Sequence, residues 1–316
     1  MKISVIIPCY NSAFCVSRAV ESVLAQTLPA DEIIVVDDGS TDDPAAALLP
    51  FDGKIRLVSR QNGGLAAARN TGFAESSGEW LLFLDADDIL LPNALKDLVR
   101  KAEEGEAGVV YGFVLQRQAD PTDAKLHGRP YAVGLPPLPA KAHFWWTPIS
   151  TAGAALIKRS LNQEVGGFDE SFRQVEDAEY WLRCGVTASF AHCDSVVLDK
   201  TYTPTSLGQQ KAGSIWYRLQ LQQKFLLWCR KKGVDTSFLE VTKTQMIDHA
   251  LTRIDRTRSW SILKLVLKTA HQMGVSSPWC WRSKVLLFLL KISGRLPKNN
   301  PKHHEVYQDW MNDEAL

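Results

Sequence analysis

Short apolar runs alternate with amphipathic stretches along residues 1–113, and this alternation constrains the fold more than any other feature. Strands are expected at 3–7, 32–36, 55–59, 80–84 and 109–113, and helices at 13–25, 65–76 and 93–104. Such alternation predicts an α/β protein whose mainly parallel sheet carries helices on both faces. Ligands of these sheets bind beyond the carboxyl ends of the strands, so the polar residues after each strand are site candidates.

The rest of the chain changes character twice. Residues 118–142 are rich in Pro, Gly and charge, which predicts a long loop. Strands are expected again at 151–157 and 195–198, with a helix at 177–184, and the pattern is helical from 215 onward. We therefore expect a main domain at 1–214, with halves at 1–105 and 106–214, and a helical C-terminal extension at 215–316.

Composition excludes several protein classes. Hydrophobic residues make up 45% and charged residues 22% of the chain, as in soluble globular proteins and unlike disordered or multi-span membrane proteins. The six cysteines include no Cys-x-x-Cys pair, which fits a reducing compartment better than a zinc knuckle or a disulfide framework. Because the apolar run at 3–7 is too short for a signal peptide, we expect a cytoplasmic protein.

The C-terminal extension is basic and rich in tryptophan. Residues 1–215 carry a net charge of −8 and residues 216–316 one of +9, and six of the ten tryptophans lie in this tail. Residues 260–296 mix apolar side chains with Lys and Arg, as helices in a membrane interface do. Two alternatives stay open: peripheral contact with the anionic inner face of the cytoplasmic membrane, or packing on the main domain. No nucleic-acid-binding motif is present, so we expect no nucleic-acid partner.

The polar residues that follow the predicted strands fall into four groups. They are Pro8, Tyr10 and Asn11; Asp37 and Asp38; Asn62, Gly63 and Arg69; and Asp85, Ala86 and Asp87. A carboxylate directly after an apolar strand, such as Asp37, can accept hydrogen bonds from a nucleobase or a ribose. Arg69 lies in a helix that follows a Gly-rich start, where it can contact a phosphate or form a buried salt bridge that holds Asp85. The sequence does not decide between these roles.

Asp85 and Asp87 form an Asp-x-Asp pair at a strand end. Such a pair places two carboxylates on one turn, where both can bind a hard divalent ion, Mn²⁺ or Mg²⁺, and leave positions for phosphate oxygens. In isolation the pair is weak evidence, because carboxylates in turns are more often solvated, and Asp88 is equally suited to cap the helix near Asn93.

Four stretches, VIIPCYN, VVDDGSTD, NGGLAAARNTG and GEWLLFLDADD, occur in this order and at this spacing in a known family. On them the chain resembles the family 2 glycosyltransferases over about residues 1–200. The resemblance implies the GT-A (nucleotide-diphospho-sugar transferase) fold, a nucleoside-diphosphate sugar donor and a divalent metal on Asp85 and Asp87. It also implies a nucleoside, with uridine as the expected base, bound by Pro8, Tyr10, Asp37 and Asp38.

The resemblance continues through GGFDESF at 166–172 and VEDAEYWLR at 175–183. In similar enzymes the second acid of the Glu-Asp pair is the catalytic base, which here implies Asp177 beside Glu176. A base is needed because a sugar hydroxyl is a poor nucleophile until its proton is removed. Without the resemblance, both acids would be interpreted as helix N-terminal residues favoured by the macrodipole.

The chain departs from the family pattern at one place. Similar enzymes often carry a His after the strand that follows this helix, but here the sequence is Leu198-Asp199-Lys200. His192 is expected before that strand and to be structural. The third protein ligand of the metal therefore stays open, with water as the substitute.

We expect an inverting transfer, by a single displacement, to a saccharide or lipid-linked acceptor in cell-surface polysaccharide biosynthesis. Trp145 offers a flat face to the acceptor sugar or, alternatively, packs in the core. A nucleotidyltransferase would need an early Gly-rich basic loop, which residues 8–13 lack. A catalytically inactive sugar-nucleotide-binding or scaffold protein is suggested by the missing His and opposed by Asp85, Asp87 and Asp177. The sequence leaves the oligomeric state open.

Overall fold

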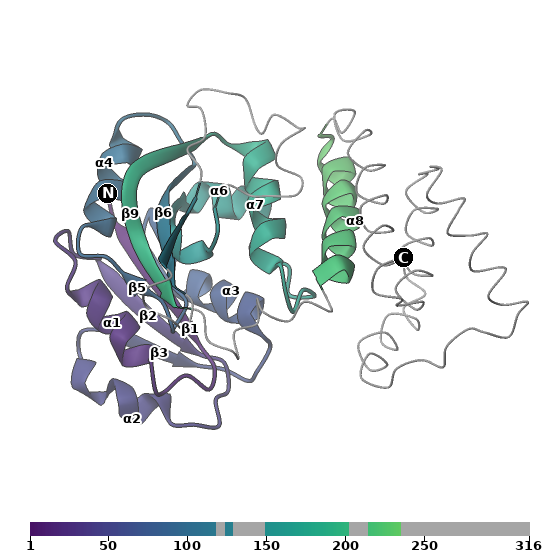
Figure 1. Ribbon diagram of the computed structural model, residues 1–316. Coiled ribbons are helices and arrows are strands. Elements are labelled where there is room, and N and C mark those ends of the chain that lie inside the picture. The colour runs from purple at the N-terminus through teal and green to yellow at the C-terminus, as the bar shows by residue number, and fades with distance from the viewer. Residues whose placement is uncertain (118–123, 129–148, 202–213, 235–316) are drawn as a thin grey trace, which may run out of the picture. The chain divides into compact units, whose positions relative to one another are not determined.

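A computed structural model of the chain describes residues 1–117, 124–128, 149–201 and 214–234 (Figure 1). The strands are β1 (Ile3–Cys9), β2 (Glu32–Asp37), β3 (Arg56–Ser59), β4 (Trp80–Phe83), β5 (Ile89–Leu90), β6 (Val109–Arg117), β7 (Ala124–His127), β8 (Ala155–Lys158) and β9 (Phe190–Thr201). The helices are α1 (Val16–Leu24), α2 (Pro44–Leu48), α3 (Leu65–Glu75), α4 (Ala94–Glu103), α6 (Arg159–Val165), α7 (Glu176–Thr187) and α8 (Ser214–Lys232), with short 3-10 turns at Leu49–Phe51 and Ala152–Ala154.

The nine strands of the described residues belong to one sheet, in the order β3-β2-β1-β4-β8-β6-β9-β5 with β7 on β6. The pairs β3-β2, β2-β1, β1-β4 and β6-β9 are parallel, and the pairs made by β8, β7 and β5 are antiparallel. The predicted α/β class is confirmed. The parallel arrangement is unbroken in the first half of the sheet, whereas the second half is mixed, because β8 runs antiparallel to both of its neighbours, β4 and β6.

Side chains of the buried strands alternate between two apolar layers. Ile3, Val5 and Ile7 of β1 belong to one layer, together with the apolar faces of α1 and α4. Ile6 of the same strand belongs to the other layer, which includes residues of α3 and α7. This alternation is the two-residue period of a strand covered on both faces, and Figure 1 shows the helices on the two sides of the sheet.

Several predicted boundaries differ from the structure. Strand β8 begins at Ala155 instead of residue 151, because a 3-10 turn occupies Ala152–Ala154. Helix α1 begins at Val16 instead of residue 13, because Cys15 and Val16 both donate their amides to Ser12 O in a turn that precedes it. Strand β9 begins at Phe190 instead of residue 195, because it pairs with β6 from Val109 onward. His192 therefore lies inside β9 and not before it.

The described chain forms one compact unit, Met1–Val234, which includes α8, and Asp235–Leu316 is a separate unit outside the described residues. Trp145 and the segment 260–296 also lie outside them. Within the described ranges, every helix is too short or too polar to cross a membrane.

Candidate active site

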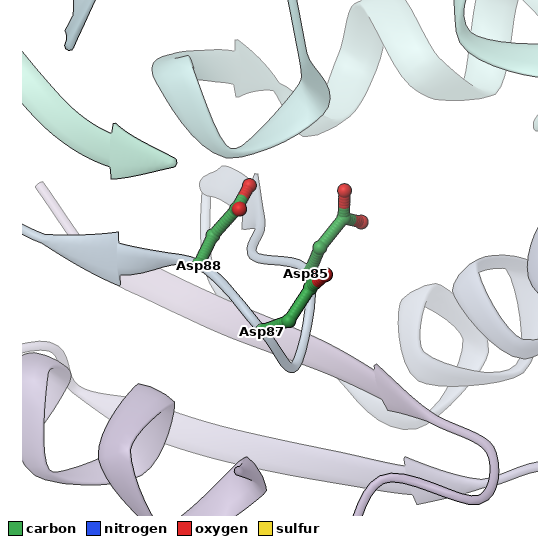
Figure 2. A group of neighbouring side chains, drawn as sticks. All are labelled: Asp85, Asp87 and Asp88. Carbon is green, nitrogen blue, oxygen red and sulfur yellow. The ribbon is translucent and has the colours of Figure 1, made fainter. Parts of the chain in front are cut away.

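The loop between β4 and β5 gathers three carboxylates, and we call its residues 85–88 the acidic turn. Asp88 N donates to Asp85 O at 3.1 Å, which closes a β-turn with an aspartate at each end. One oxygen from each of Asp85, Asp87 and Asp88 lies within 4.8 Å of the others. Figure 2 shows these three side chains on the one loop. The structure thus adds Asp88, which is fully buried, to the predicted pair.

Arg69 of α3 links the acidic turn to the start of α7. Its guanidinium donates to Asp85 Oδ1 through Nη2 and to Glu176 Oε1 through Nη1, both at 2.8 Å, and its side chain is 2% exposed. The guanidinium also lies over the aromatic ring of Phe168, with its Cζ 5.1 Å from the ring centroid. Of the two roles that the sequence allowed, the structure shows the buried salt bridge that holds Asp85.

Lys200 of β9 reaches the acidic turn from the opposite side. Its Nζ lies 3.0 Å from Asp88 Oδ2 and 3.4 Å from Asp85 Oδ2. The antiparallel ladder of β5 and β9 pairs Ile89 with Asp199. Asp88 and Lys200 are the next residues along each strand, so this register brings their side chains together.

The surroundings of the acidic turn lower the pKa of one of its carboxyl groups and raise the pKa of the other two. Burial acts to raise the pKa of Asp85, but Arg69 and Lys200 outweigh it and lower this pKa to about 2. Burial raises the pKa of Asp88 to about 8 against the opposing charge of Lys200. Burial and the Asp85 charge raise the pKa of Asp87. Asp85 is therefore the permanently ionised member of the group.

The oxygens of the turn suit a hard divalent cation. Three carboxylates converge, Asp88 Oδ1 is buried without a hydrogen-bond partner among the described residues, and Asp87 forms no ion pair within them. Carboxylate oxygens are the ligands that Mg²⁺ and Mn²⁺ prefer. The donor set fits the metal that the sequence predicted, although Lys200 competes for two of its oxygens.

Asp177 stands at the start of α7, beside this cluster. Its Oδ1 accepts from Ala178 N at 2.7 Å, and its other oxygen has no hydrogen-bond partner in the described part of the chain. Burial raises the pKa of Asp177. The charges of Arg69 and Lys200 act to lower this pKa and that of Asp85 acts to raise it, but burial dominates. Val175, the residue directly before α7, has φ 60° and ψ 17°, a left-handed conformation that is strained for a β-branched side chain.

A second group of polar residues lies after β1 and β2. The buried Asp38 accepts hydrogen bonds from Arg60, from Gly63 N and, at 2.7 Å, from Gly64 N. Its carboxylate therefore anchors the loop at 60–64, and a nucleoside that contacts it must share it with these donors. Asp37 is less buried, and its Oδ1 accepts from Ser40 N at 2.9 Å.

The remaining predicted residues occupy different positions around this edge. Asn11, at φ 49°, accepts from Thr41 N at 2.8 Å and thereby ties the end of β1 to the loop after β2. Tyr10 is 50% exposed and free to stack on a ligand, whereas Pro8 and Ala86 are buried. Asn62 is exposed beside Gly63.

Lys200 and Arg60 were not among the site residues predicted from the sequence, yet each contacts an aspartate of the site. A lysine at the end of a strand was the available signal for Lys200, but β9 was expected to stop at residue 198. His192 is only 5% exposed, and its ring centroid lies 4.9 Å from that of Tyr111 and 4.4 Å from that of Phe113. This packing gives it a structural role.

Comparisons with known proteins agree with the geometry. The family model described as Glycosyl transferase family 2 matches residues 4–166. An uncharacterized glycosyltransferase of Rickettsia typhi is 30% identical over 230 residues, which cover 68% of this chain and 70% of the relative. The glycosyltransferase GlyG of Streptococcus pneumoniae is 39% identical over 114 residues, which cover 35% of this chain and 38% of GlyG.

The match spans less than two thirds of some relatives, such as 58% of an uncharacterized glycosyltransferase of Rickettsia prowazekii. Among solved structures, residues 1–349 of S. aureus TarS in complex with UDP-GlcNAc superpose with a TM-score of 0.56 at 20% identity, covering 87% of this chain and 93% of that one. The corresponding UDP complex gives a TM-score of 0.54 at 19% identity, covering 90% and 87%. These likenesses show that the two chains share the GT-A fold.

Proposed function

The chain belongs to glycosyl transferase family 2, and from this premise we propose that it transfers a sugar from a nucleoside-diphosphate donor to a hydroxyl group of a glycan or lipid-linked acceptor. The convergence of the acidic turn, Arg69 and Asp177 at one edge of the sheet carries the proposal. We assign catalysis to residues 1–214, with donor binding in 1–105 and acceptor binding in 106–214.

The donor's nucleoside lies against the loops after β1 and β2 in this proposal. Tyr10 is exposed and stacks on the base, while the carboxylates of Asp37 and Asp38 accept its hydrogen bonds. Asn11, Asn62 and Gly63 shape the loops around it, because they connect β1, β2 and α3. UDP is the expected leaving group, supported by the binding of UDP and UDP-GlcNAc to the structurally similar TarS.

Asp177 removes the proton of the acceptor hydroxyl as that oxygen attacks the anomeric carbon. One carboxylate oxygen is held by Ala178 N, so the other is free to take the proton. The raised pKa of Asp177 makes it a stronger base than an exposed aspartate. A single displacement of this kind forms the new C–O bond as the bond to the diphosphate breaks, and it inverts the anomeric configuration.

Asp85, Asp87 and Asp88 would hold a divalent metal in this proposal. Such an ion supplies charge stabilisation to the departing diphosphate. Arg69 keeps Asp85 ionised and oriented, and it holds Glu176, which precedes the base. Ala86 contributes only its buried position in the turn.

The acceptor is proposed to be a precursor of a cell-surface polysaccharide, with Trp145 against its sugar. The basic charge of residues 216–316 supports contact of the segment 260–296 with an anionic membrane, which would place the protein at the inner face of the cytoplasmic membrane. Trp145 and the segment 260–296 lie outside the described residues.

The experiment that tests the proposal measures nucleotide release by the purified protein with UDP-, GDP- and dTDP-sugars, with and without Mn²⁺ or Mg²⁺. We expect release from one UDP-sugar, lost in Asp177→Asn. If no donor reacts or binds with any metal, an inactive sugar-nucleotide-binding protein becomes the better description.

A further inference from the structure

Lys200 is the more exposed of the two cations that contact the acidic turn within the part of the chain that the structure describes. Its side chain is 18% exposed and ends in an ammonium on a flexible stem. Arg69, the other cation in contact with the turn, is 2% exposed and fixed by two carboxylates on separate elements. A change in the charge of the site can therefore move Lys200 more easily than Arg69.

Lys200 holds oxygens that a metal ion would need. Asp85 Oδ1 is occupied by Arg69, and Lys200 lies next to Oδ2 of both Asp85 and Asp88. Mg²⁺ and Mn²⁺ take several oxygen ligands each. Asp87 can offer ligands without disturbing an ion pair, but a second protein ligand from the turn comes from an oxygen that Lys200 contacts or from the buried Asp88 Oδ1.

We propose that Lys200 is a built-in counter-cation that a divalent metal must displace from Asp85 and Asp88, so that this lysine sets the metal affinity of the acidic turn. The inference rests on the metal use contained in the proposed function. Without metal, the ammonium lies against Oδ2 of Asp85 and of Asp88 and balances negative charge in the acidic turn. With metal, the two cations repel each other across a few ångström, and the ammonium leaves the shared oxygens.

The test titrates Mn²⁺ into the full chain without donor and compares the parent with Lys200→Met, which keeps the length of the stem and removes the charge. We expect Lys200→Met to bind Mn²⁺ about tenfold more tightly or better, as measured by the electron paramagnetic resonance signal of free Mn²⁺. Lys224→Met is the matched control. Lys224 Nζ pairs with Asp169 Oδ2 at a distance of 2.9 Å, and this pair includes no residue of the acidic turn. The control variant should keep the parent's affinity.

An unchanged or weaker Mn²⁺ affinity in Lys200→Met overturns the inference, and so does failure of both proteins to bind Mn²⁺. Should the variant not fold, the parent itself gives the answer through acetylation of Lys200, followed by mass spectrometry. Saturating Mn²⁺ should increase acetylation of Lys200 and leave that of Lys224 unchanged. Equal acetylation of Lys200 with and without bound metal contradicts displacement.

The Mn²⁺-binding test of Lys200 can fail independently of the proposed transferase function, because nucleotide release from the donor is assayed separately. Release without any Mn²⁺ binding would retain the transferase proposal and reject the displacement. Mn²⁺ binding that tightens in Lys200→Met, without release from any donor, would do the reverse.

Discussion

The guanidinium of Arg69 donates to Asp85 Oδ1 at 2.8 Å and so fixes α3 to the acidic turn, although the two residues lie on different elements. The same guanidinium holds Glu176, one residue before Asp177. A single buried cation therefore sets the spacing between the carboxylates assigned to the metal and the one assigned to the base.

Replacing Arg69 by Met should destabilise the protein by about 3–5 kcal/mol, because it leaves the buried carboxylate of Glu176 without its cation and leaves Asp85 with Lys200 alone. Urea unfolding measures the free-energy change. Arg56→Met is the control: Arg56 pairs with Glu75 where the side chains are 50% and 45% exposed, so its effect should stay within about 1 kcal/mol. Equal stability of Arg69→Met and the parent would show that the bridge does not hold the site together.

Asp177→Asn should lower the turnover number by about 10²- to 10⁴-fold while UDP binding is retained, because the amide cannot accept the acceptor's proton. Steady-state kinetics and UDP titration measure the two quantities. Asp194→Asn, at a side chain that is 90% exposed, serves as the control and should match the parent. A variant with the parent's turnover number would remove Asp177 from the mechanism.

The pH dependence of kcat/KM should show an acid limb from Asp177. The group must be deprotonated to act as a base, and burial raises its pKa. Activity should therefore fall as pH decreases through a value above the usual Asp pKa of about 3.9. This limb should vanish from the residual activity of Asp177→Asn. A profile that stays flat down to about pH 4 would conflict with this assignment.

Chelation by EDTA should reduce nucleotide release, and added Mn²⁺ should restore it. Asp87→Asn should weaken this restoration without lowering the melting temperature, because Asp87 forms no ion pair within the described residues and the contacts of Arg69 and Lys200 stay in place. Titration of Mn²⁺ against the release rate, together with a thermal melt, makes the check. Release that is insensitive to EDTA would argue against metal use.

Gly39→Ala should destabilise the fold more than Gly53→Ala, although both glycines have φ +73°. A Cβ on Gly39 would lie 2.8 Å from Asn62 N, whereas a Cβ on Gly53 meets nothing within 4 Å. The conformational strain of about 1 kcal/mol is common to both, so the difference reports the close approach of the loop after β2 to the loop at 60–64. Thermal unfolding of both variants measures it, and equal losses would mean that the loop adjusts freely.

Strands β1 to β4 and helices α1, α3 and α4 were predictable from the sequence, because two-residue and helical periods are local properties of the chain. The short elements α2 and β5 carry too few residues to show such a period and were not predicted. Pro8 to Asn11, Asp37 and Asp85 could be placed at one edge of the sheet for the same reason, since parallel strands end on the same side. The motifs also determined the family, which the comparisons confirm.

The pairs of charges that meet at that edge could not be predicted from the sequence. Lys200 and Asp85 are 115 residues apart in the sequence and meet through the β5–β9 ladder. Arg69 and Glu176 are 107 residues apart and meet because α3 and α7 share one apolar layer. No local period encodes such pairings, since strand register and helix packing depend on how distant segments bury their apolar faces together.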